Sequence, residues 1–142
     1  MKSLSLEEKA LWIYLVSCLL TYSGYSIFLF WQSANMPLIE TGYEQAMIMS
    51  IGAVIFINIL GRILLAVMYS RDAYNKDIRD KEINRFGEYV GCSLLAFTVL
   101  IPFGMVLYEV DHFWIAHTMY AAFALSTLTA TTVKLVAYQR GF

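Results

Sequence analysis

The sequence predicts an all-α membrane protein with four transmembrane helices, arranged as two antiparallel hairpins with both termini in the cytoplasm. First, 59% of the 142 residues are hydrophobic and 15% are charged, whereas an ordinary soluble domain is about half apolar and about a quarter charged. Second, four long stretches are nearly free of charged residues. Third, apart from Arg62, lysine and arginine are confined to the two ends of the chain and its middle connection, a pattern that orients membrane helices.

The first two spans are expected at about residues 10–31 and 46–70. Each exceeds the roughly 20 apolar residues that cross a bilayer as a helix, and a helix satisfies the backbone groups that hydrocarbon cannot. The first span is too long for the apolar core of a secretory signal, which has about 7–15 residues, and it shows no convincing small-residue cleavage pattern. We therefore expect it to remain in the mature protein.

The third and fourth spans are expected at about residues 89–108 and 113–135. Their connection, "EVDH", is so short that the two helices must be antiparallel neighbours. Pro102 lies inside the third span and has no N–H to donate to the carbonyl of Thr98, so we expect a kink there. The four spans use nearly the whole chain, and we expect a single domain over residues 1–142.

Small residues recur at four-residue intervals near these two spans. Gly87 lies just before the third span and Gly91 near its start. Ala122, Ser126 and Ala130 are spaced by four residues in the fourth span. Small side chains at this spacing let helix backbones approach closely. We expect them to serve mainly the packing of the bundle on itself, and a homo-oligomer formed through them is the alternative.

Basic residues fix the expected orientation. Lys2 and Lys9 precede the first span, Lys134 and Arg140 close the chain, and five more basic residues lie in the connector of residues 71–88. The other two connections, "QSANMPLIETGYEQ" and "EVDH", contain acidic residues but neither lysine nor arginine. Because basic residues near span ends are retained in the cytoplasm, we expect both termini and the 71–88 connector there, in a multi-pass protein of the bacterial inner membrane.

Arg62 is the single charge of the second span, and Asn58 lies four residues before it on the same helix face. Charged residues inside a membrane often mark a ligand site. One interpretation is therefore a polar pocket of Asn58 and Arg62 that binds an anion or a lipid phosphate, as in a small transporter or lipid-binding protein. The other is that Arg62 anchors the helix at the cytoplasmic interface and pairs with Glu88, at the start of the third span.

The connector of residues 71–88 carries ten charged residues, five of each sign. Opposite charges three and four residues apart support a helix, which would either continue the second span or lie along the membrane surface. The connector is also longer than neighbouring helices require. It is interpreted either as a solvated turn that fixes topology or as a docking surface for a cytoplasmic protein. The expected contacts of that surface are Asp77, Arg79, Asp80 and Arg85.

Several function classes find no support in the sequence. His112 and His117 point about 140° apart on a helix, which is poor geometry for one metal ion. Cys18 and Cys92 indicate neither a disulfide nor a zinc site. There is no basic patch or reader motif for direct nucleic-acid binding, and no acidic residue inside a span to couple ions. We expect no cofactor, no metal and no catalytic residues, and hence no enzyme.

The connector "KDIRDKEINRFGEYVG" and the C-terminal "YQRG" resemble those of small bacterial four-helix membrane proteins. In that group an acidic-x-Arg-Asp pattern, matched by Asp77, Arg79 and Asp80, precedes a span, and the chain often ends in Tyr-Arg-Arg-Gly. This chain departs at Ile78, where the group commonly has a second acidic or polar residue, and at Gln139, where it has Arg. The resemblance implies an inner-membrane protein of unknown activity, often associated with a helix-turn-helix regulator.

These observations lead to one expected function. The chain would be a non-enzymatic component of the inner membrane, regulatory or sensory, whose connector docks a soluble partner such as a helix-turn-helix regulator. Its other partners would be membrane lipids. The alternative is the small transporter or lipid-binding protein that uses Arg62 and Asn58.

Overall fold

The computed structural model describes residues 5–34, 36–69 and 78–140, and these are mainly helical, with no strand among them. The elements in chain order are α1 (Leu6–Ser33), the 3-10 helix η1 (Leu38–Glu40), α2 (Tyr43–Met68), α3 (Ile78–Thr98), α4 (Leu100–Leu107) and α5 (His112–Arg140). Taking α3 with α4 as one stretch, four segments are long and apolar enough to cross a membrane. The predictions of an all-α chain and of four such segments are confirmed.

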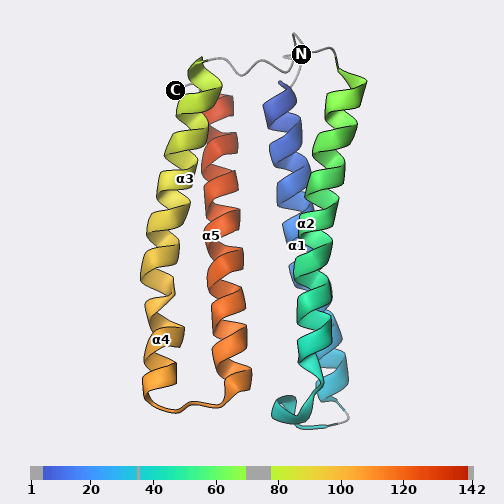
Figure 1. Ribbon diagram of the computed structural model, residues 1–142, viewed down its shortest axis with the longest axis vertical. Coiled ribbons are helices and arrows are strands. Elements are labelled where there is room, and N and C mark those ends of the chain that lie inside the picture. The colour runs from blue at the N-terminus through green and yellow to red at the C-terminus, as the bar shows by residue number, and fades with distance from the viewer. Residues whose placement is uncertain (1–4, 35, 70–77, 141–142) are drawn as a thin grey trace. The chain divides into compact units, whose positions relative to one another are not determined.

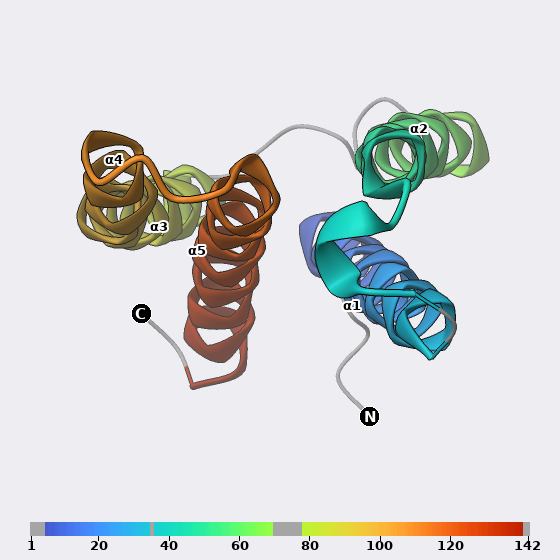
Figure 2. The same cartoon turned by 90° about the horizontal axis from the view of Figure 1, so that it is seen from below.

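The structure divides into two compact units, and the first, residues 1–75, contains α1 and α2. These two helices lie side by side in both views (Figures 1 and 2). At mid-length, the amide nitrogen of Asn58 donates to the hydroxyl of Ser17 over 3.1 Å. Near the start of α1 and the end of α2, the Lys9 ammonium donates to the hydroxyl of Tyr69 over 2.6 Å. Polar contacts thus join the two helices at two levels.

The second unit, residues 76–142, consists of α3 and α4 packed along α5 (Figure 1). Val99 separates α3 from α4 but keeps right-handed helical dihedrals, and its N–H still donates to the carbonyl of Leu95 over 2.9 Å. The interruption lies three residues before Pro102, next to the carbonyl of Thr98 that Pro102 leaves without a helical donor. The helix is therefore interrupted at the predicted place.

Local capping explains where two of the helices begin. The Ser5 hydroxyl accepts from the N–H of Glu8 over 3.2 Å, and the Glu8 carboxylate accepts from the N–H of Ser5 over 2.9 Å, which makes a capping box. At α5, the carboxylate of Asp111 accepts from the N–H of Phe113 over 2.8 Å. Because of its capping box, α1 begins at Leu6, before the expected limit near residue 10.

The charged connector differs most from expectation. Its second half forms the first three turns of α3 and runs without a break into the apolar part of that helix, whereas α2 ends at Met68. The described part is thus an extension of the third span, and neither a continuation of the second span nor a separate surface helix. The reason is packing: Ile83 and Gly87 are both buried in this part of α3, and they extend the face that the helix presents to α5.

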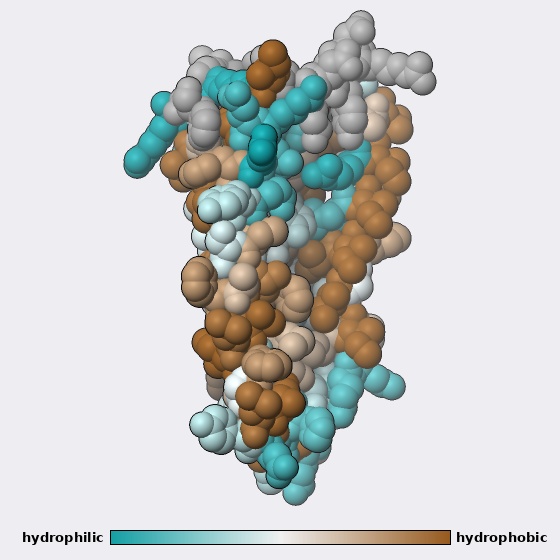
Figure 3. Space-filling view, turned by 60° about the vertical axis from the view of Figure 1, so that its left-hand side comes forward, coloured by the Kyte–Doolittle hydropathy of each residue, from teal (hydrophilic) through white to brown (hydrophobic). Residues whose placement is uncertain are grey.

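Apolar side chains cover much of the outside of the helices. Figure 3 shows hydrophobic residues along the helices and hydrophilic residues gathered toward the ends of the visible face. On α2, Met49, Phe56 and Val67 are 73%, 66% and 80% exposed. A water-soluble protein rarely exposes apolar patches of this extent. Together with the four long apolar segments, this indicates a multi-pass membrane protein.

A close approach in the second unit lies between Gly91 of α3 and Ala130 of α5. A Cβ added to Gly91 would lie 2.7 Å from the Cβ of Ala130 and 3.3 Å from the carbonyl oxygen of Ser126. The Ser126 hydroxyl donates to the carbonyl of Gly91 over 2.7 Å in the same buried region. The small residues singled out in the sequence therefore pack α3 on α5 within one chain.

We expect Gly91→Ala to destabilise the protein by about 1–3 kcal/mol, the usual cost of overpacking a tight interface. Its new methyl group would meet the rigid Cβ of Ala130, so the helices must separate. The measurement is the midpoint of thermal unfolding in detergent. Gly104→Ala is the matched control, because nothing lies within 4 Å of a Cβ added there. Equal midpoints for the two variants would contradict the close packing described.

Candidate functional site

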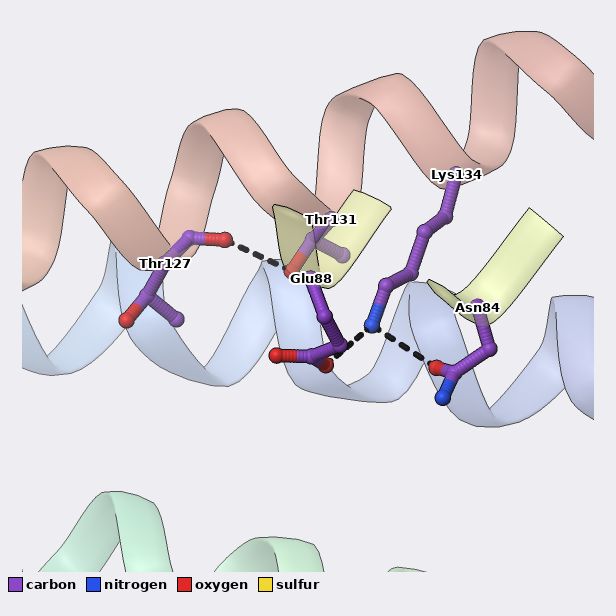
Figure 4. Close-up of polar contacts among 5 residues, drawn as sticks. All are labelled: Asn84, Glu88, Thr127, Thr131 and Lys134. Carbon is purple, nitrogen blue, oxygen red and sulfur yellow. Dashed lines mark hydrogen bonds and ion pairs between the residues drawn. The ribbon is translucent and has the colours of Figure 1, made fainter. Parts of the chain in front are cut away.

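A lysine on α5 forms the centre of the most polar region between the helices of the second unit. Lys134 is 6% exposed, and its ammonium donates to the amide oxygen of Asn84 over 2.8 Å and to a carboxylate oxygen of Glu88 over 2.5 Å. Figure 4 shows the lysine side chain reaching from α5 to these two residues of α3. A buried ammonium is costly unless it is paired, and here it has both an anionic and a neutral acceptor.

Gly87 makes the room that this lysine occupies. A Cβ at position 87 would lie 2.3 Å from Cγ and 2.6 Å from Cε of Lys134. The aliphatic part of the lysine thus lies over the bare backbone of α3. Asn84 and Glu88 are four residues apart, one turn above the other on the same face. Their side chains therefore reach the ammonium together.

The Glu88 side chain lies at the edge of the interface between α3 and α5. It is 60% exposed, against 8% for the side chain of Lys134. One carboxylate oxygen accepts a hydrogen bond from the buried ammonium. The cation therefore compensates the charge of Glu88, although the carboxylate remains partly exposed. A surface ion pair contributes little to stability, and a buried pair must offset the desolvation of both charges; here the exposed carboxylate keeps part of its hydration.

A second set of contacts lies one turn closer to the start of α3. The hydroxyl of Tyr138 donates to the Asp80 carboxylate over 2.7 Å, and the guanidinium of Arg79 donates to the carbonyl of Tyr138 over 3.4 Å. That carbonyl lies in the last turn of α5, where a cation is favoured by the helix dipole. We call the contacts of Asp80, Asn84 and Glu88 with Tyr138 and Lys134 the polar ladder.

The structure describes three of the four predicted partner contacts, Arg79, Asp80 and Arg85. Asp77 lies outside the described residues. Arg79 and Asp80 both contact Tyr138, and Arg79 and Arg85 are exposed, whereas Asp80 is only partly so. Structure thus assigns Asp80 to the joint between α3 and α5 and leaves the two arginines accessible.

Charge is sorted between the two sides of this segment of α3. The acidic residues Asp80 and Glu88 contact α5 through the polar ladder. The exposed charged residues of the described part, residues 78–88, are the basic Arg79, Lys81 and Arg85 and the acidic Glu82 and Glu88. Because the ammonium of Lys134 compensates the charge of Glu88, the basic residues outnumber the uncompensated acid on this exposed side.

The structure gives Asn58 and Arg62, the residues of the predicted polar pocket, different surroundings. Asn58 donates to Ser17 and, over 2.7 Å, to the carbonyl of Val54. Arg62 is exposed. It lines a small pocket of about 10 Å³, with room for about one water molecule. The other lining residues are Leu6, Glu7, Ala10 and Leu65. Glu88, the third residue of that prediction, is bound to Lys134.

The sequence interpretation missed the central residue of the region. It used Lys134 only as a marker of orientation and did not single out Asn84. A signal was present, because Asn84, Gly87, Glu88 and Gly91 recur at spacings of three and four, as expected for one helix face. Their acceptor groups required a donor from a neighbouring helix, and the late part of α5 offers Lys134.

The described residues offer no metal site, since no group of three or more His, Cys, Asp or Glu side chains gathers among them. His117 contacts the carbonyl of Phe113 through Nδ1 over 2.6 Å and packs on the ring of that residue. Searches for similar proteins found no matching family model, no matching curated protein and no matching solved structure.

We expect Glu88→Ala to lower stability by about 1–2 kcal/mol, because it removes a charged hydrogen bond from a buried ammonium, with some compensation by Asn84. Glu82→Ala, at an exposed position on the same helix, should change it by less than about 0.5 kcal/mol. Unfolding in detergent of Glu88→Ala, Lys134→Met and the double variant forms a cycle that isolates the pair. Strict additivity in that cycle would show that the two residues are not coupled.

Proposed function

We propose that this chain is a non-enzymatic component of the bacterial inner membrane, regulatory or sensory, whose cytoplasmic segment docks a soluble partner. Its helices would form two antiparallel hairpins with both termini in the cytoplasm. Four long apolar segments support the membrane location. The confinement of lysine and arginine, apart from Arg62, to the chain ends and the middle connection supports this orientation.

One observation carries the docking proposal: the first three turns of α3 are a helical extension of a spanning segment, held to α5 by the polar ladder. Such a surface is ordered before the partner arrives, so binding it costs little conformational entropy. The exposed contacts would be Arg79 and Arg85, joined by Glu82. Asp80 would act through Tyr138 by positioning the segment.

The resemblance described above supports one kind of partner. Proteins with a similar connector are often associated with a helix-turn-helix regulator, and we propose a soluble protein of that kind. The alternative of a small transporter is less well supported, because Asn58 is bonded to Ser17 and the pocket beside Arg62 is small.

The proposed orientation is tested with single cysteines introduced into a variant that lacks Cys18 and Cys92. A membrane-impermeant maleimide is added to intact cells that contain the variant. A cysteine at Lys81 should stay unlabelled until the inner membrane is permeabilised. A cysteine at Glu40 should react at once, because its connection would face the periplasm. Rapid labelling at position 81 in intact cells would reverse the topology and remove the docking proposal.

The docking proposal predicts a discrete protein adduct when a photocrosslinking amino acid replaces Glu82 in cells. The same group at Phe123, which is 49% exposed on α5, is the control within the span and should give no such adduct. Combining the probe at position 82 with Arg79→Glu and Arg85→Glu should reduce the adduct at least tenfold, because two charge contacts of about 1 kcal/mol or more would become repulsive. An adduct that survives the reversal would not depend on this surface.

A further inference from the structure

Three exposed residues of α3 follow one another along one side of the helix. Lys81, Arg85 and Tyr89 are spaced by four residues and are all exposed, Tyr89 to 72%. Residues four apart lie one above the other on a helix. We call these three residues the basic stripe.

The polar ladder leaves the basic stripe with a positive charge. Asp80 accepts from Tyr138, and the carboxylate of Glu88, on the flank of the stripe, is compensated by the ammonium of Lys134. Glu82 and Glu88 are the exposed acidic residues of residues 78–88, and Glu88 is the one whose charge Lys134 compensates. An anion that approaches Lys81 and Arg85 therefore meets a cationic surface.

The position of Tyr89 at the start of the charge-free part of the helix predicts that the stripe lies near the phosphates of a bilayer. Tyr89 begins the charge-free part of the helix, and tyrosine favours the membrane interface. At about 1.5 Å per residue, Arg85 lies about 6 Å and Lys81 about 12 Å beyond it. The headgroup layer on each side of the hydrocarbon is roughly 5–8 Å thick, and the long lysine side chain can bend back toward it.

From this arrangement we propose that the basic stripe binds the headgroup of an anionic glycerophospholipid. Arg85 would hold the phosphate in a bidentate contact, Lys81 would add a second cation, and Tyr89 would pack its ring against the upper acyl chain and glycerol. The site rests on the charges of α3 and shares Arg85 with the docking surface proposed above, so lipid and soluble partner would compete for that residue, and the test below contains no soluble partner. An acidic protein surface is the competing occupant.

The test uses the purified full chain in a neutral detergent and native mass spectrometry with added phosphatidylglycerol or phosphatidylcholine. The wild type should bind phosphatidylglycerol more tightly. Each cation near a membrane surface contributes about a fivefold factor, so Lys81→Gln with Arg85→Gln should weaken phosphatidylglycerol binding about 25-fold and leave phosphatidylcholine binding unchanged. Arg85→Lys alone should keep part of the preference.

Arg62→Gln is the matched control, since it removes an exposed cation of the first unit, and it should keep the full preference. The proposal would be overturned if Arg62→Gln lost the preference for phosphatidylglycerol while the Lys81 and Arg85 double variant kept it. That result would place the lipid in the pocket beside Arg62. Equal binding of the two lipids by the wild type would also overturn it and leave the acidic protein as the occupant. Both substituted side chains of the stripe are exposed, so circular dichroism should show an unchanged fold.

Discussion

The arrangement of the second unit depends on one buried cation. Lys134 lies almost completely within the interface of α3 and α5, where an unpaired ammonium would cost several kcal/mol. Asn84 and Glu88 supply its acceptors, and Gly87 gives up its side chain so that the lysine can reach them. Meeting these three requirements sets the register of the two helices. The same register brings Tyr138 to Asp80 and Ser126 to Gly91.

In the first unit, polar side chains at the interface of α1 and α2 are also paired across the interface, but with neutral partners. Asn58 finds Ser17 across the interface, and Lys9 donates to Tyr69 while its ammonium lies 4.5 Å from the centre of that ring. Hydroxyl and amide groups replace the carboxylate of the second unit, so no buried ion pair is required. Each unit nevertheless has a tyrosine near the end of its last helix that bonds to a charged residue near the start of its first.

Much of the fold could be predicted because length and apolarity alone determine whether a helix can cross a bilayer. The segments that became α1, α2 and α5 were recognised in this way, and Pro102 located the interruption before α4. The beginning of α3 was missed because the prediction followed charge. Ile83 and Gly87 continue the buried face of the helix through a segment that is highly charged, so packing and not composition sets the start of that helix. The contact between Lys134 and Asn84 could not be predicted from the connector, because the two residues lie 50 positions apart in the sequence. The predicted partner contacts Arg79, Asp80 and Arg85 stay a prediction.

The space that Gly87 leaves for Lys134 has a consequence for the divergence of this sequence. A homologous chain that gains a side chain at position 87 cannot keep a long residue at 134 in the same place, and the loss of that cation removes the reason for an acid at 88. We therefore expect the three positions to vary as a linked set, with glycine, lysine and glutamate either inherited together or replaced together by an apolar combination. Such co-substitution would leave its trace in an alignment even where the rest of the two helices has drifted.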